Sequence, residues 1–160
     1  MKFVNVFIFV LSLVITTHAN EIIDIDAKIK LAQKEDKYIM MFFHIPRCPY
    51  CLEMLNENFK DEDVLKLIKN NFLLIDIYTA DKKIVKFNNF RGSTKEFAKH
   101  IGASAYPATL FLNQNKEVVF RSIGYRNIQE YLPELKYIKT KSYLKKELEE
   151  FKIDLELMED

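Results

Sequence analysis

Two uninterrupted apolar runs of strand length dominate the hydrophobic pattern. Residues 38–43 read Tyr-Ile-Met-Met-Phe-Phe, and residues 72–78 read Phe-Leu-Leu-Ile-Asp-Ile-Tyr. Runs of this kind are typical of strands that are covered on both faces. A third strand is expected over residues 108–112. Because residues 113–116 have the composition of a tight turn, residues 118–120 are expected to return as its antiparallel partner.

Helices are expected in the segments between and after these strands. Four of them lie at residues 22–34, 48–59, 94–101 and 128–138. The apolar spacing of the first is mixed, but its length and its lack of glycine and proline favour a helix. The second carries Leu52, Leu55 and Phe59 on one stripe, and Asp61 is expected to cap a further helix after it. Gly102 is a signal for the end of the third.

Two further segments are rich in polar and charged residues. Residues 79–93 are expected to form an inserted, solvated loop with a short strand or hairpin at 84–87, and a partner-selecting surface is the alternative. Residues 142–160 are expected to be helical as far as Phe151 and frayed beyond it. The apolar residues of this segment suit packing against the domain, with a partner site as the alternative; they are Tyr143, Leu144, Leu148 and Phe151.

The order of these elements predicts an α/β fold. A crossover helix makes the first two strands parallel, whereas the tight turn makes the last two antiparallel. The result is a three-layer α/β/α arrangement with a mixed sheet of about four to five strands flanked by helices. The domain is expected to span residues 20–140, followed by a helical tail at 141–160. Ligand sites in such sheets lie at the carboxyl ends of the strands, here just after Phe43.

Residues 1–19 have the composition of a secretory signal peptide. Lys2 gives a positive start, residues 3–15 are mostly apolar, and Ala19 is a small residue before the expected cleavage site. The apolar run is shorter than the about 20 residues of a membrane-spanning helix, although an uncleaved anchor is the alternative. We therefore expect an exported protein of the periplasm.

Composition narrows the function and draws attention to the cysteines. The chain has 160 residues, of which 49% are hydrophobic, which is enough for one globular domain with a sizeable core. Its 24 basic residues nearly balance its 23 acidic ones, so no nucleic-acid partner is expected. Only two cysteines are present. In an oxidising compartment, cysteines that can pair tend to be paired.

Cys48 and Cys51 form a C-x-x-C motif directly after a predicted buried strand. A disulfide across so short a loop constrains the unfolded chain little, so chemistry explains the pair better than stability does. At a helix start, the free N–H groups and the dipole favour a thiolate at Cys48, and Arg47 adds a positive charge. Pro49 suits the first helical turn. Half of a zinc site and a redox-inactive pair are the alternatives, although zinc would need two more ligands.

With these residues the chain resembles the thioredoxin-like superfamily, and within it the secreted bacterial thioredoxin-like proteins of the SoxW type. The resemblance covers residues 36–140 and rests on the Cys-Pro-Tyr-Cys motif, the strand containing Asp76, the helix at residues 96–98, the sequence 105–112 and Gly124-Tyr125. It implies that Pro107 is a cis-proline facing the disulfide. It also implies that Tyr106 borders the substrate groove, where its backbone can bind an extended partner chain.

The chain departs from thioredoxin proper at two positions before the motif. Phe42 occupies the place of a buried aspartate, and His44 the place of a tryptophan. Proton transfer from Cys51 therefore needs another acceptor: water, His44 or a carboxylate such as Asp76. Histidine is suited to that role because its charge changes near neutral pH, and an exposed loop histidine is the alternative.

Taken together, the residues and the resemblance predict an exported thiol–disulfide oxidoreductase that acts on the disulfides or thiols of client proteins. Cys48 attacks, Cys51 resolves the mixed disulfide, and Tyr50 lies beside the attacking sulfur. No cofactor is expected, and a monomer is expected. The resemblance favours a reductase, which would need a membrane electron-transfer partner of the thiol-reductase type. A partner-binding module without redox turnover, an oxidase and an isomerase are the alternatives.

Overall fold

The computed structural model describes residues 21–159, and its centre is a four-stranded mixed sheet. The expected signal peptide and its cleavage site lie outside the described residues. The strands run in the order β3-β2-β6-β7, with bounds β3 (Phe72–Tyr78), β2 (Tyr38–His44), β6 (Ala108–Leu112) and β7 (Val118–Ile123). β2 is parallel to β3 and antiparallel to β6, and β7 returns antiparallel to β6. The α/β prediction and its mixed sheet are confirmed.

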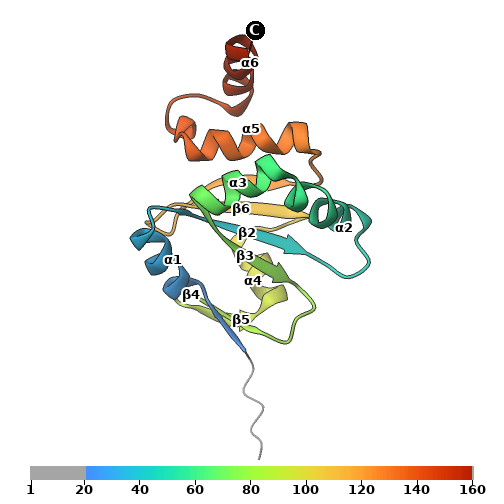
Figure 1. The fold of residues 1–160 in the computed structure, drawn as a ribbon. Coiled ribbons are helices and arrows are strands. Elements are labelled where there is room, and N and C mark those ends of the chain that lie inside the picture. Colours follow the sequence, from blue (N-terminus) through green and yellow to red (C-terminus); the bar gives the residue numbers. More distant parts are fainter. Residues whose placement is uncertain (1–20, 160) are drawn as a thin grey trace, which may run out of the picture.

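β2 separates two hydrophobic cores because its side chains alternate between the faces of the sheet. Met41 and Phe43 belong to one core, together with α1 (Ile25–Lys34) and α4 (Thr94–Ile101). Met40 and Phe42 belong to the other, together with α2 (Pro49–Asn56), α3 (Glu62–Asn71) and α5 (Ile128–Lys139). Figure 1 shows α2, α3 and α5 over one face of the sheet and α4 on the opposite side. As predicted, β2 is covered on both faces.

β3 differs from this expectation because it is an edge strand of the sheet. Its residues on one face are covered, with Ile75 and Ile77 in a core. On the other face Leu74 is 38% exposed and Asp76 is exposed. The prediction that both faces are covered is therefore wrong for β3, since the helices cover that face only near its start.

A second, three-stranded sheet contains the segment that the sequence predicts to be a loop. It has the order β1-β4-β5, with bounds β1 (Ile22–Asp24), β4 (Ile84–Phe87) and β5 (Phe90–Ser93). The hairpin expected near residues 84–87 is present, but it belongs to a sheet. Residues 22–24 form a strand parallel to β4 and not the first turn of a helix. Asp24 ends that strand and caps α1 by accepting a hydrogen bond from the Ala27 N–H at 2.9 Å.

The helix ends follow the capping signals, and the apolar stripe predicted for α2 is correct except at its first residue. Asp61 caps α3, and Gly102 ends α4 with a φ of 86°. In α2 the buried residues are Cys51 and Met54, whereas Leu52 is 56% exposed. Leu55 and Phe59 pack against the core as predicted, and the stripe is wrong only at Leu52. Within residues 21–159, no helix combines the length and hydrophobicity needed to cross a membrane.

The C-terminal tail packs on α5 and continues as a helix beyond the predicted end. A short 3₁₀ turn (Ser142–Leu144) leads into α6 (Leu148–Glu159). Phe151 is buried, and its ring centroid lies 5.4 Å from that of Tyr137. The hydroxyl groups of Tyr143 and Tyr38 are hydrogen-bonded at 3.0 Å. Leu144 is 69% exposed and does not contribute. The frayed end expected after Phe151 is therefore wrong: the helix continues to Glu159, and Leu148, Phe151 and Leu155 pack against the core that α5 covers.

Candidate active site

The Cys-Pro-Tyr-Cys turn begins where β2 ends, at the carboxyl edge of the central sheet. Arg47 has a φ of 56°, in the left-handed region, and so reverses the chain just before the motif. Cys48 is the N-cap residue of α2, and Pro49 takes the first helical position. There proline has the required φ, and its missing N–H costs no hydrogen bond.

Cys48 and Cys51 form a disulfide in the structure, with their Cα atoms 5.2 Å apart. Cys48 retains 9% of its surface exposed and Cys51 only 1%. The backbone N–H of Cys51 donates a hydrogen bond to Cys48 Sγ at 3.1 Å. A cap position of this kind favours negative charge on the sulfur, because it faces otherwise unpaired helix N–H groups. The two sulfurs are therefore inequivalent: the more exposed one lies where a thiolate is stabilised.

An open pocket of about 430 Å³ adjoins the disulfide on the side of β3. It is lined by both cysteines and by Arg47, His44, Asp76 and Tyr78. The pocket forms because the carboxyl ends of β2 and β3 meet at the start of α2, with His44 opposite Tyr78 in the strand register. The sequence predicted His44 and Arg47 for this site and named Asp76 as a carboxylate within reach. It missed Tyr78, although that residue ends a predicted strand at the same edge.

His44 lies between aromatic rings and beside a carboxylate. Its ring is stacked on Phe42 with centroids 5.6 Å apart and lies 4.9 Å from the ring of Tyr78. Its Nε2 atom is 2.9 Å from Asp76 Oδ1, which is ion-pair distance when the imidazole is protonated. The same nitrogen is buried without a hydrogen-bond partner, so the contact is short but not aligned as a hydrogen bond. The side chain is 14% exposed, and His44 is therefore not an exposed loop histidine.

Aromatic side chains surround the opposite side of the motif. Tyr50 is 59% exposed, and its ring lies 5.4 Å from that of Tyr125. The Tyr125 hydroxyl donates a hydrogen bond to Glu53 Oε1 at 2.6 Å, which raises the pKa of Tyr125 to about 12. Leu52, which is 56% exposed, lies on the other side and lines the pocket with His44 and Asp76. Tyr50 lies beside the motif as expected, and Glu53 was missed because its partner is far away in the sequence.

Tyr106 and Pro107 immediately precede β6, and the peptide bond between them is cis. Ala108 pairs with Phe43, so the register places Pro107 at the same sheet edge as the cysteine turn. The Pro107 carbonyl accepts a hydrogen bond from the Gly124 N–H at 2.8 Å. That bond ties the loop before β6 to the segment that carries Tyr125.

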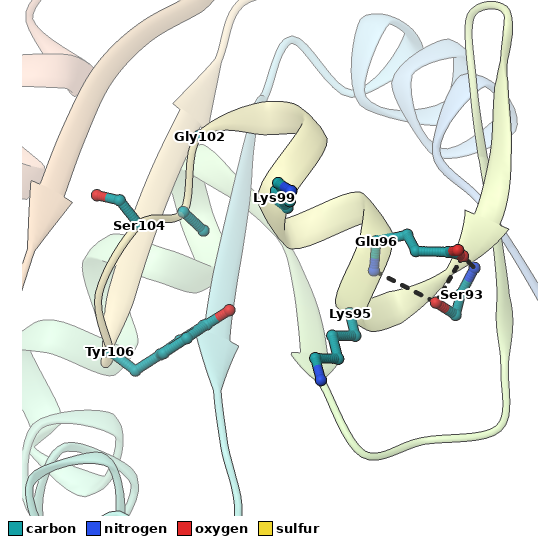
Figure 2. A pocket seen from close by; sticks show the side chains of 8 residues that line it. Ser93, Lys95, Glu96, Lys99, Gly102, Ser104 and Tyr106 are labelled. Atoms are coloured by element: carbon teal, nitrogen blue, oxygen red, sulfur yellow. Dashed lines mark hydrogen bonds between the residues drawn. The ribbon is translucent and has the colours of Figure 1, made fainter.

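The Tyr106 side chain lies in a different pocket from the cysteines. This pocket measures about 640 Å³, and Lys95 and Lys99 of α4 also line it, as Figure 2 shows. Tyr106 packs against the core on that side of the sheet, and burial raises the pKa of its hydroxyl. The expectation that Tyr106 borders the substrate groove therefore remains a prediction for its backbone, while its side chain contributes to packing.

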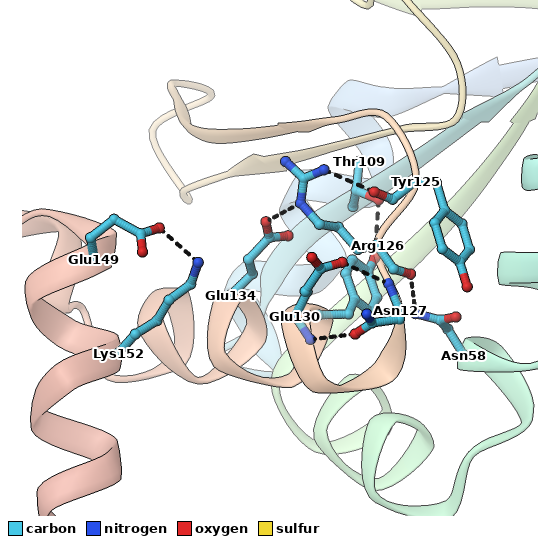
Figure 3. A network of polar contacts seen from close by, with 10 residues as sticks. Asn58, Thr109, Tyr125, Arg126, Asn127, Glu130, Glu134, Glu149 and Lys152 are labelled. Carbon is cyan, nitrogen blue, oxygen red and sulfur yellow. Dashed lines mark hydrogen bonds and ion pairs between the residues drawn. The ribbon is translucent and has the colours of Figure 1, made fainter.

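A buried carboxylate holds the loop that carries Tyr125. Arg126 Nε donates to Glu134 Oε1 at 2.9 Å, and another Arg126 nitrogen donates to the Tyr125 carbonyl at 2.9 Å. Asn58 donates to the Arg126 carbonyl at 2.9 Å, which connects this loop to the segment after α2 (Figure 3). Glu134 is only 2% exposed, and burial raises its pKa despite the neighbouring guanidinium.

No group of three or more histidine, cysteine or acidic side chains within residues 21–159 is arranged to hold a metal ion. The donor set around the cysteines contains one imidazole, and its nitrogen faces Asp76. The chemistry of the site is therefore derived from the two sulfurs and the protein groups next to them.

The fold, the Cys-x-x-Cys turn at a helix start and the proline that follows at the same sheet edge define a class of protein. A family model described as "Thioredoxin-like domain" matches residues 25–139, and the chain belongs to this family. No curated protein sequence shows significant similarity to the chain.

Solved structures show the same fold at low sequence identity. A thioredoxin-fold protein from Helicobacter pylori is 20% identical with a TM-score of 0.65, covering 76% of this chain and 81% of its own. A disulphide isomerase from Xylella fastidiosa is 16% identical with a TM-score of 0.55, covering 71% and 87%. The C-terminal domain of DsbD from Neisseria meningitidis is 16% identical with a TM-score of 0.52, covering 70% and 90%. At these identities the likeness concerns the fold alone.

Proposed function

We propose that this protein is an exported thiol–disulfide oxidoreductase that reduces disulfides in client proteins. In this function the thiolate of Cys48 attacks a client disulfide, and Cys51 then attacks Cys48 and releases the client. The observation that carries the proposal is the inequivalence of the two sulfurs. Cys48 is the more exposed and accepts the Cys51 N–H at a helix start, whereas Cys51 is buried one turn further on.

Comparison with other members of the fold supports disulfide exchange as the reaction class. The Xylella fastidiosa protein is named a disulphide isomerase, and the Neisseria meningitidis DsbD domain has been solved in oxidised and reduced forms. The signal-like composition of residues 1–19 supports export, and the resemblance to SoxW-type proteins supports the reductive direction. A reductase in the periplasm would receive its electrons from a membrane partner of the thiol-reductase type.

Insulin reduction in the presence of a dithiol tests the activity. The wild-type protein is expected to accelerate insulin precipitation, and Cys48→Ser is expected to bring the rate down to the uncatalysed background, since the remaining thiol of Cys51 is buried and cannot reach a client disulfide. The melting temperature of the variant shows whether it is folded. A Cys48→Ser protein with the wild-type rate would overturn the mechanism. Client binding that survives replacement of both cysteines by serine, without turnover in the wild type, would favour the partner-binding module.

Two further measurements test the direction and the location. Equilibration with a glutathione redox buffer gives the reduction potential, which for a reductase is expected nearer to the about −270 mV of thioredoxin than to the about −120 mV of a strong oxidase. Expression of the full chain in a Gram-negative host is expected to yield a periplasmic protein that begins at Asn20. A potential close to the oxidase value, or a chain that retains Met1 in the cytoplasm, would contradict the respective part of the proposal.

A further inference from the structure

The inner sulfur of the motif presents a problem of proton transfer. Cys51 is 1% exposed, and as a thiol it must lose a proton before it can attack Cys48. Burial in apolar surroundings opposes formation of a thiolate. Phe42, on the strand beneath the motif, is fully buried and apolar, so it offers no acceptor for the proton. The group that receives it must lie elsewhere on the same side.

His44 is the base that the pocket presents to this side of the motif. It lies two residues after Phe42 on β2, and both therefore point to the sheet face that α2 covers. His44, Cys48 and Cys51 line the same pocket. The rings of Phe42 and Tyr78 hold the imidazole in place. Its Nε2 is buried beside the Asp76 carboxylate without an aligned hydrogen bond, so a proton on that nitrogen would face the carboxylate.

Asp76 is the carboxylate placed to stabilise a protonated His44. It comes from β3, and its Oδ1 atom lies 2.9 Å from His44 Nε2. The other charged groups lining the pocket are Asp81 and Arg47. Asp81 is paired with Lys83 at 3.4 Å, and Arg47 is a cation, so neither can replace Asp76 as the partner of an imidazolium. The remaining titratable group on β3 at the pocket, the Tyr78 phenol, faces the ring of His44.

We propose that His44 accepts the proton of Cys51 during resolution of the mixed disulfide, and that Asp76 stabilises the imidazolium that results. This inference rests on the proposed function and assigns its second step to particular side chains. Thioredoxin proper has a buried aspartate beneath the motif, at the position of Phe42. Here a pair of side chains from two adjacent strands takes its place: the imidazole takes up the proton, and the carboxylate balances the charge.

The electrons and protons balance as follows. Cys48 Sγ forms a bond to one client sulfur, and the client's other sulfur leaves as a thiolate that takes a proton from solvent. Cys51 then transfers its proton to His44, and its thiolate attacks Cys48 Sγ. The Cys48–Cys51 disulfide forms, and the second client sulfur leaves as a thiolate that takes a proton from solvent. The protein dithiol is oxidised by two electrons, the client disulfide is reduced to two thiols, and His44 passes its proton to solvent in the open pocket.

A chromogenic aromatic disulfide separates the two steps in a stopped-flow measurement on the reduced protein. Attack by Cys48 releases the first coloured thiolate in a phase that depends on reagent concentration. Resolution by Cys51 releases the second in a phase that does not. In the wild type the second phase is expected to rise less steeply with pH than the hydroxide concentration does, because His44 and not hydroxide takes the proton. In His44→Phe, which preserves the ring packing, it is expected to slow by about tenfold to 100-fold and to become proportional to hydroxide concentration.

The control variants separate proton transfer from packing. Asp76→Asn is expected to slow the second phase by about threefold to tenfold, because it removes the charge that stabilises the imidazolium. His100 lies on α4, and its ring stacks on that of Phe90 with the centroids 4.6 Å apart. His100→Phe is expected to change neither phase. A second phase that keeps its wild-type rate and pH profile in His44→Phe would overturn the proposal, and so would an equal slowing of both phases. If the proposed function itself fails, the wild type will resolve the aromatic disulfide but will not reduce insulin.

Discussion

The two sides of the cysteine pair differ in chemistry. One side suits contact with the client, and the other suits transfer of a proton within the protein. The outer side, formed by Tyr50 and Tyr125, is aromatic and is exposed to solvent at Tyr50. The inner side, formed by His44, Asp76 and Tyr78, contains an imidazole and a carboxylate 2.9 Å apart. Aromatic surface suits contact with many polypeptides, whereas a base and its counter-charge suit movement of a proton.

The strongest test of this division is Cys51→Ser. Cys48 is expected to attack client disulfides at a rate close to that of the wild type, because the outer side is intact. Turnover is expected to fall by at least about 100-fold, because nothing resolves the mixed disulfide. Non-reducing electrophoresis of cell extracts, followed by mass spectrometry, should show adducts that disappear on reduction. If no adducts accumulate while Cys48→Ser also behaves like the wild type, the assignment of the two roles is wrong.

The second test concerns Phe42, which supports the inner side. Its ring is fully buried, and its centroid lies 4.8 Å from that of Phe59. Phe42→Ala is expected to lower the free energy of unfolding by about 3–5 kcal/mol, because it leaves a cavity beneath His44. Urea denaturation measures the change. Leu74→Ala is a suitable control, since this side chain is 38% exposed and should cost about 1 kcal/mol or less. Equal losses would mean that the inner side does not depend on this packing.

The third test alters the outer side alone. Tyr50→Ala is expected to lower kcat/KM for a protein disulfide by about fivefold, corresponding to about 1 kcal/mol of lost contact. The reaction of Cys48 with a small aromatic disulfide should remain within about twofold of wild type, since such a substrate covers little of this surface. Tyr50→Phe should retain most of the protein activity because the ring is kept. A loss of the same size for both substrates would indicate a change at the sulfur.

The smallest effect is expected from Glu134, which anchors the loop of the outer side through Arg126. Burial raises the pKa of Glu134 above its ordinary value of 4.5. Its contribution to stability is therefore complete below about pH 4.5 and is lost as the pH rises through the folded-state pKa. In Glu134→Gln this pH dependence disappears. The difference between wild-type and variant unfolding free energies should fall with rising pH over that window, and a rise would contradict the assignment.

The elements that were predicted with the correct bounds carry their signals locally. The strand Phe72–Tyr78 is a continuous apolar run, and the helix Thr94–Ile101 lies between a Ser93–Glu96 capping box and Gly102. The Cys48 cap and Pro49 at the first helical position follow from the order of four residues. Signals of this kind require no knowledge of the rest of the chain.

The features that were missed depend on pairing between distant segments. β1 is a strand because Ile22 pairs with Ile84, and nothing in residues 22–24 alone distinguishes this from a helix start. The contact between His44 and Asp76 follows from the register of β2 and β3, in which Phe42 lies opposite Asp76. The sequence predicts that these strands are parallel neighbours. It does not predict their register, and a shift of one residue would turn Asp76 to the other face.

Because this chain of 160 residues contains only one cysteine pair, its number of free thiols reports its redox state directly. A thiol titration of the denatured protein should give two equivalents for the dithiol and none for the disulfide, and in a mixed disulfide one equivalent from this chain in addition to the free thiols of the client. Once the free protein has been separated from its client adducts, the titration gives the distribution of the chain among three steps of one cycle. No cysteine outside the motif has to be replaced before this measurement.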